Sequence, residues 1–138
     1  MIGVVVVTHG QLATELVNAA ETIVGDLPQF AAVSIGWHDD VDDAREEIRQ
    51  AIAGVQGPEG VLILTDMFGG TPANLGLTFL EADRVEVITG VNLPMLIKLA
   101  GTKKAASLLA VAREMRDEGR NAIWIASDLL RSETKGDG

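Results

Sequence analysis

The amino-acid sequence predicts an α/β fold: an open, mostly parallel, doubly wound sheet of about four parallel strands, one antiparallel strand at the C-terminal edge, and helices on both faces. Three observations support this prediction. Apolar runs such as Val4–Val7 and Val61–Leu64 show no polar alternation, which is typical of strands covered on both faces. These runs alternate with segments of helical periodicity, which favours right-handed crossovers between parallel strands. The 138 residues are 47% hydrophobic, enough to build the core of one domain.

The first half of the chain predicts two strand–helix pairs. The opening run MIGVVVVTHG reads as a strand with His9 at its carboxyl end, and a turn at Gly10 leads into a helix over 11–24 that Gly25 caps. A second strand follows at Phe30–Ile35. The next helix carries apolar side chains on one face and closes at 54–57. Its positive end can be capped by one of three acids: Asp39, Asp40 and Asp42.

The second half repeats this alternation. A third strand at Gly60–Asp66 precedes a helix that Thr71 should cap, with Pro72 in its first turn, and that runs to about Glu81. The pattern then predicts a strand, a short helix, a longer amphipathic helix capped by Gly119, and a last strand: Arg84–Thr89, a segment ending near Gly101, Lys104–Glu118, and Asn121–Ala126.

The C-terminal end is the least regular part of the predicted fold. The strand at Asn121–Ala126 could lie antiparallel at the sheet edge or pair with another subunit. The domain is expected to span residues 1–128, followed by a tail of residues 129–138 in which Ser132–Gly138 frays.

The composition limits the possible functions. The chain has no cysteine, which excludes a disulfide, a thiolate nucleophile and a Cys-based metal site. Twenty acidic against eleven basic residues give a formal charge of −9, which disfavours nucleic acid and anionic membranes as partners. A cytoplasmic location fits these features.

Polar residues follow two of the predicted strands at the edge where open α/β sheets place their ligands. The first and third strands of a doubly wound sheet are commonly neighbours, which would bring His9 and Asp66 together. A carboxylate bonded to one imidazole nitrogen leaves the lone pair of the other nitrogen free to attack. Beside them, the N–H groups of Gly69, Gly70 and Thr71 can cradle an anion at the start of a helix. A histidine, an orienting acid and an anion cradle together predict a phosphohistidine site.

Each feature also has a plainer interpretation. A single histidine after a strand is often a turn or core residue, and Asp66 could be a loop acid or a cap. Gly-Gly-Thr-Pro alone is turn and cap chemistry. His38 stands beside Trp37, Asp39 and Asp40, but a solvated turn explains this cluster better than a metal site does. The functional interpretation therefore depends on the three features meeting at one sheet edge.

Three segments resemble the IIA component of the mannose-family sugar phosphotransferase system: VVVVTHG, TDMFGGTPAN and TGVNLPML. They fall at the spacing of that family, and the similarity runs from Met1 to about Ala126. The resemblance implies that His9 accepts a phosphoryl group on Nε2 from the histidine-containing phosphocarrier protein and passes it to a separate IIB component for sugar uptake. Asp66 would hydrogen-bond the histidine, while Gly69, Gly70 and Thr71 would contact the phosphoryl oxygens. The family also implies a homodimer whose last strand pairs across subunits, and no cofactor or metal is expected.

The chain departs from the best-known members of the family at Met67, Phe68 and Ala73, which could alter the surface that a partner meets. Other functions remain open at this point. The phosphotransferase subunit of dihydroxyacetone kinase also begins with a strand ending in histidine, but it lacks the Gly-Gly-Thr-Pro pattern. A receiver domain would be phosphorylated on Asp66, a metal hydrolase would use His9 and His38 with Asp66, and a regulatory module could be phosphorylated without serving a transporter.

Overall fold

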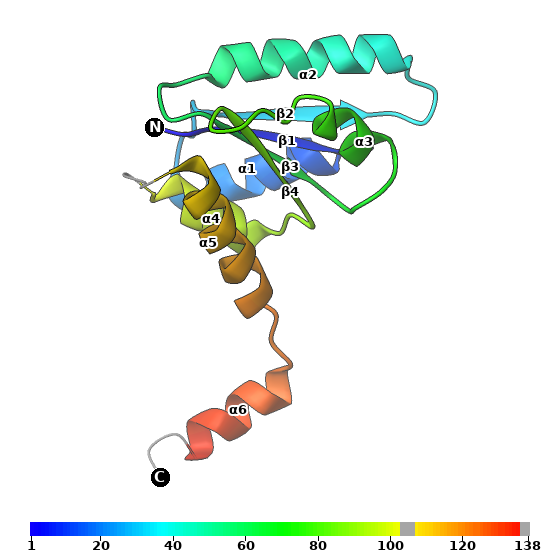
Figure 1. Ribbon diagram of the computed structural model, residues 1–138. Coiled ribbons are helices and arrows are strands. Elements are labelled where there is room, and N and C mark those ends of the chain that lie inside the picture. Colours follow the sequence, from blue (N-terminus) through cyan, green and yellow to red (C-terminus); the bar gives the residue numbers. More distant parts are fainter. Residues whose placement is uncertain (103–106, 136–138) are drawn as a thin grey trace.

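The computed structural model describes residues 1–102 and 107–135. Its four strands form one sheet in the order β2-β1-β3-β4, and all three neighbouring pairs are parallel (Figure 1). The strands are β1 (Gly3–His9), β2 (Phe30–Ile35), β3 (Val61–Thr65) and β4 (Val85–Thr89). The helices are α1 (Leu12–Val24), α2 (Val41–Val55), α3 (Thr71–Leu77), α4 (Leu93–Ala100), α5 (Leu108–Asn121) and α6 (Ala126–Lys135).

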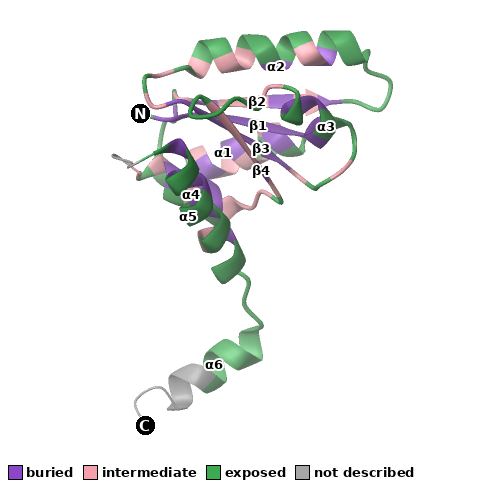
Figure 2. Ribbon diagram, in the orientation of Figure 1, coloured by how far each residue is buried: buried purple, intermediate pink, exposed green. Residues whose placement is uncertain are grey.

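Helices cover both faces of the sheet, as the unbroken apolar strands require. One core joins alternate residues of the strands, such as Val4 and Leu62, to α1, α4 and α5. The other core joins the intervening residues, such as Val5 and Ile63, to α2 and α3. Figure 2 shows the buried strands between these two layers of half-exposed helices. The two central strands are β1 and β3, which fits their unbroken apolar runs, Val4–Val7 and Val61–Leu64.

The predicted antiparallel edge strand at Asn121–Ala126 is wrong for the single chain. Asn121 ends α5, residues 122–125 form no strand, and Ala126 begins α6, which projects away from the sheet (Figure 1). The physical reason is that a strand needs a neighbour for its N–H and C=O groups, and this segment runs away from β4. The expected tail of residues 129–138 therefore begins inside α6, and residues 136–138 lie outside the described part of the chain.

Three local expectations also change. Asp40 caps α2 as expected, but α3 starts after Gly70, so Thr71 is its first residue and makes no cap bond. The same helix ends at Leu77 rather than near Glu81, because the next amides bond three residues back and tighten the chain into turns. Gly119 lies within α5 instead of capping it, and it is buried where a Cβ would lie 2.8 Å from the Cε of Met95. Residues 104–106 of the expected Lys104–Glu118 helix lie outside the described residues.

Among the helices that the structure describes, none is long and apolar enough to cross a membrane.

Candidate functional site

The two polar strand ends meet at the carboxyl edge of the sheet, because β1 and β3 are hydrogen-bonded neighbours. Val7 of β1 is paired with Thr65 of β3. His9 follows Val7 by two residues and Asp66 directly follows Thr65, so the two residues lie next to each other at this edge. Thr8 fixes the turn after β1, since its buried hydroxyl accepts a bond from the Ala13 N–H of α1 at 2.6 Å. The sequence-predicted neighbourhood of His9 and Asp66 is therefore present in the fold.

Asp66 holds the imidazole of His9 in one orientation. Its Oδ2 atom lies 2.8 Å from Nδ1 and also accepts the His9 backbone N–H at 3.1 Å. The Met67 N–H donates to Oδ1 at 3.0 Å, which fixes the other carboxylate oxygen. Because an ionised carboxylate can only accept, Nδ1 carries the proton, and in the neutral imidazole the lone pair is then on Nε2. The His9 side chain is 50% exposed and that of Asp66 is 15% exposed, so the imidazole faces solvent while the carboxylate is sheltered.

The electrostatics of the pair favour the ionised acid. Burial acts to raise the pKa of Asp66, but the hydrogen bonds from the His9 ring and backbone and the attraction of the imidazole outweigh it. The net result is an Asp66 pKa below its ordinary value. A carboxylate that stays ionised can balance positive charge that develops on the ring.

The loop after Asp66 lies against the reactive nitrogen. Gly69 and Gly70 both have φ of +85°, which L side chains rarely adopt. A Cβ on Gly70 would lie 3.3 Å from Nε2 of His9, so only glycine leaves the space beside that atom open. Within the described residues, the backbone N–H groups of Gly69, Gly70 and Thr71 make no hydrogen bond. These donors can therefore bind oxygens of a group held at Nε2.

His9 opens into a cavity of about 550 Å³ on the same edge of the sheet. Its walls come from the end of β1, the loop between β2 and α2, and the loop before α3. The lining residues are His9, Gly10, Ile35, Gly36, Trp37, Asp39, Val41, Gly70 and Thr71. Trp37 and Val41 were not expected at this site from the sequence, although an aromatic residue inside a polar turn was a signal for Trp37.

The site does not assemble the metal cluster that a hydrolase would require. Over residues 1–102 and 107–135, no three His, Asp or Glu side chains are grouped so that they could hold a metal ion. The hydrolase hypothesis needed His9, His38 and Asp66 to converge, and His38 is not grouped with His9 and Asp66.

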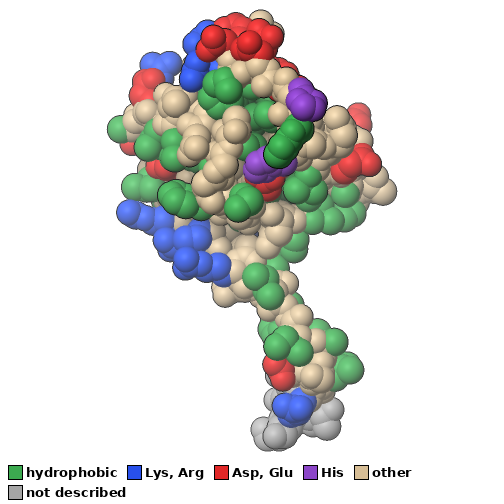
Figure 3. All heavy atoms as spheres, turned by 90° about the vertical axis from the view of Figure 1, so that its right-hand side faces the viewer, with side chains coloured by type: hydrophobic (Ala, Val, Ile, Leu, Met, Phe, Trp, Pro, Cys, Tyr) green, Lys and Arg blue, Asp and Glu red, His purple; other side chains and the backbone are tan. Residues whose placement is uncertain are grey.

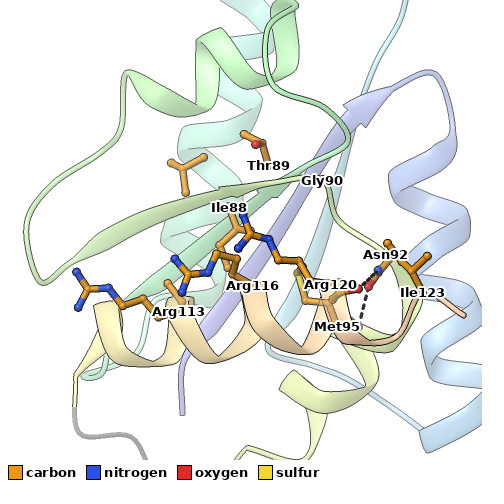
Figure 4. A pocket seen from close by; sticks show the side chains of 12 residues that line it. Ile88, Thr89, Gly90, Asn92, Met95, Arg113, Arg116, Arg120 and Ile123 are labelled. Carbon is orange, nitrogen blue, oxygen red and sulfur yellow. Dashed lines mark hydrogen bonds between the residues drawn. The ribbon is translucent and has the colours of Figure 1, made fainter.

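A separate cavity of about 380 Å³ between β4 and α5 is lined by Arg113, Arg116 and Arg120 (Figure 4) and does not include His9.

Comparison with known proteins agrees with this geometry. A family model described as "PTS system fructose IIA component" matches residues 3–116. The fructose-specific EIIA component of Bacillus subtilis is 27% identical over 94% of this chain and 90% of its own length. The mannose-specific EIIAB component of Escherichia coli K12 is 31% identical over 88% of this chain, which spans 39% of that longer protein. The mannose/sorbose-specific IIA subunit of Enterococcus faecalis, a solved structure, superposes with a TM-score of 0.80 over 90% of this chain at 25% identity and 93% coverage of its own chain.

The fold and these matches define a IIA-type phosphocarrier component of a sugar phosphotransferase system. Within that class, the chain belongs to the mannose (EIIA-man) family.

Proposed function

We propose that this chain carries a phosphoryl group on Nε2 of His9, taking it from the histidine-containing phosphocarrier protein and passing it to a IIB component for sugar uptake. The observation that carries the proposal is the Nδ1–Asp66 bond of 2.8 Å, which leaves Nε2 exposed and unprotonated beside Gly70. The relatives' names refer to fructose, mannose and sorbose systems, and the sugar served by this chain is left to experiment.

The transfer can be written as an in-line displacement. The lone pair of Nε2 attacks phosphorus as the donor's P–N bond breaks, and the donor histidine keeps the electron pair of that bond. The His9 ring retains its Nδ1 proton and gains positive charge, which the Asp66 carboxylate balances. The N–H groups of Gly69, Gly70 and Thr71 supply donors for the phosphoryl oxygens, so positioning and electrostatics provide the catalysis. The second step reverses this sequence with the IIB nucleophile as acceptor.

The test is phosphorylation from phosphoenolpyruvate through the two general phosphotransferase proteins. We expect one acid-labile phosphoryl group on the wild type and none on the His9→Ala variant, because His9 is the histidine that lines this cavity. Resistance of the label to hydroxylamine would distinguish His9 from an acyl phosphate on Asp66. A folded wild-type protein that takes no label from donor proteins of the same source would contradict the proposal. Label that no IIB component can remove would favour a regulatory module.

We also propose that the protein is a homodimer in which residues 122–130 of each copy cover the β4 side of the other. Two features support this assembly. β4 is an edge strand, and beside it lies the cavity between β4 and α5 with Ile123 at one end (Figure 4). The segment after α5 exposes Ile123, Trp124 and Ile125, an apolar run that a single copy leaves in water.

A further inference from the structure

Large apolar side chains surround His9 and remain in water. Trp37 is 94% exposed and Phe68 is 76% exposed, and Val41 and Met67 are also exposed. Trp37 and Val41 line the His9 cavity, while Met67 and Phe68 belong to the loop that follows Asp66. Figure 3 looks onto this face and shows hydrophobic side chains next to the histidines. Exposed apolar side chains on two loops, the one before α2 and the one after Asp66, therefore form the rim of the site.

The exposed aromatics have no role in the core. The chain has only two Trp and three Phe residues, and two of these five, Trp37 and Phe68, lie on the rim. An indole that is almost wholly exposed contributes little buried area to folding. Tryptophan is instead enriched among the few side chains that dominate the affinity of protein interfaces, and phenylalanine is enriched in interfaces as well. These two residues therefore fit anchors that become buried when a partner docks.

The charges beside this rim indicate the chemistry of the partner. Asp39 lines the cavity, with its carboxylate held 2.6 Å from the Gly36 N–H, and Asp42 and Asp43 follow at the start of α2. In Figure 3, acidic side chains gather along one side of the face that carries the histidines. A donor that brings a negatively charged phosphohistidine to this face meets repulsion unless it also carries basic side chains on that side.

We propose that Trp37 and Phe68 anchor a docking surface for the phosphohistidine donor protein. The donor surface that fits is an apolar patch around the phosphohistidine, bordered by Lys or Arg side chains that face Asp39 and Asp43. This inference rests on the proposed function and adds to it the residues that recognise the donor. Trp37 and Phe68 are docking residues and take no part in the chemistry at Nε2.

Fluorescence tests the docking directly. The chain has two tryptophans, so Trp124→Phe leaves Trp37 as the only one. Titration with the unphosphorylated donor, its own tryptophans replaced by phenylalanine, should shift the Trp37 emission to shorter wavelength and protect it from acrylamide quenching, with saturation. An emission spectrum and quenching constant that stay unchanged at saturating donor would overturn the proposal, whether or not His9 becomes phosphorylated.

Steady-state transfer kinetics provide the second readout. Trp37→Ala and Phe68→Ala should each raise KM for the phosphorylated donor about tenfold or more, with kcat within about twofold of the wild type. Ile23→Ala is the matched control, because Ile23 is exposed on α1 away from the His9 cavity, and it should leave both constants unchanged. A fall in kcat at unchanged KM would overturn docking in favour of an effect on His9 itself. Absence of any transfer to the wild type would instead contradict the proposed function.

A separate variant tests the carboxylates beside the rim. Asp43→Asn removes a carboxylate that makes no side-chain bond in the described structure and leaves the Asp40 cap in place. We expect a raised KM at low salt and a weaker dependence of KM on salt than in the wild type, since less attraction remains to be screened. Glu114→Gln, on α5, is the control for the same loss of charge elsewhere. A KM that Asp43→Asn lowers or leaves unchanged would overturn the basic character assigned to the donor surface.

Discussion

At the scale of single residues, the site depends on what touches the two nitrogens of one imidazole. Asp66 lies 2.8 Å from Nδ1, and Gly70 leaves open the space at Nε2. In the proposed mechanism, Asp66 orients the ring and balances its charge, whereas Gly70 keeps the approach to phosphorus clear. Both roles follow from the proposed mechanism, and each can be tested separately.

The ionised state of Asp66 makes part of the stability dependent on pH. Its folded-state pKa is lowered, so its contribution is present above the unfolded value of about 3.9 and is lost as the pH falls through the folded value. We expect Asp66→Asn to be less stable than the wild type near neutral pH, with the difference shrinking below about pH 4. Urea unfolding at several pH values measures this gap. A gap that stays constant down to pH 3 would contradict the assignment.

The same carboxylate should matter for transfer. We expect Asp66→Ala to slow phosphorylation of His9 by about tenfold or more while the fold stays intact, because the ring loses its orienting partner and its counter-charge. Single-turnover labelling from the phosphorylated donor measures the rate, and circular dichroism checks the fold. Transfer at the full wild-type rate would remove Asp66 from the mechanism.

Two adjacent glycines offer a matched pair of variants. Gly69 and Gly70 share a φ of +85°, but a Cβ at Gly70 would lie 3.2 Å from Cε1 of His9, whereas one at Gly69 would meet nothing within 4 Å. Both alanine variants carry the same backbone strain, so we expect similar losses of stability. Only Gly70→Ala should slow His9 phosphorylation markedly, by about tenfold relative to Gly69→Ala. Equal transfer rates for the two variants would contradict a role for this contact.

At the scale of elements, α2 packs closely on the sheet at the end of the helix farthest from the Trp37 loop. The last turn of α2 passes directly over the start of β1, where Gly3 has no side chain. A Cβ at that position would lie 2.2 Å from the Val55 carbonyl oxygen. At this point α2 is therefore seated on the backbone of β1 rather than on a side chain.

We expect Gly3→Ala to lower the free energy of unfolding by about 2–3 kcal/mol, because neither backbone can move without disturbing the sheet. Gly54→Ala is the control, since Gly54 lies in α2 with nothing within 4 Å of an added Cβ. That variant should raise stability by about 0.5–1 kcal/mol through helix propensity. Chemical denaturation measures both values. A neutral Gly3→Ala variant would show that α2 can shift away from β1.

At the scale of the whole molecule, one copy leaves its C-terminal part without a packing partner. Figure 1 shows α6 at the end of an extended connection, and residues 123–125 on that connection are exposed. The sheet ends at β4 on the side of α5, where the arginine-lined cavity lies. The exposed apolar segment of one copy can cover the β4 edge of a second copy, which is why we propose a dimer.

The dimer can be tested by mass in solution. We expect the wild type to have twice the 14.6 kDa mass of one chain in sedimentation equilibrium at micromolar concentration. Trp124→Asp should give the single-chain mass, because a carboxylate would have to be buried in the interface. Ile23→Asp, an equally exposed apolar position on α1, should stay dimeric. A monomeric wild type at high protein concentration would contradict the proposed assembly.

The amino-acid pattern alone was enough to predict the parallel strands and the pairing of His9 with Asp66. Buried strands and strand ends are local patterns, and parallel topology then places the two ends together. Three features became known only from the folded chain: the conformation of residues 122–126, the packing of Gly119 and the exposure of Trp37. Each of these depends on contacts between distant parts of the chain. Residues 122–126 have no strand beside them to pair with, Gly119 packs against Met95, and the Trp37 indole is left exposed. Residue type and periodicity report what a segment prefers, while long-range packing decides whether that preference is met.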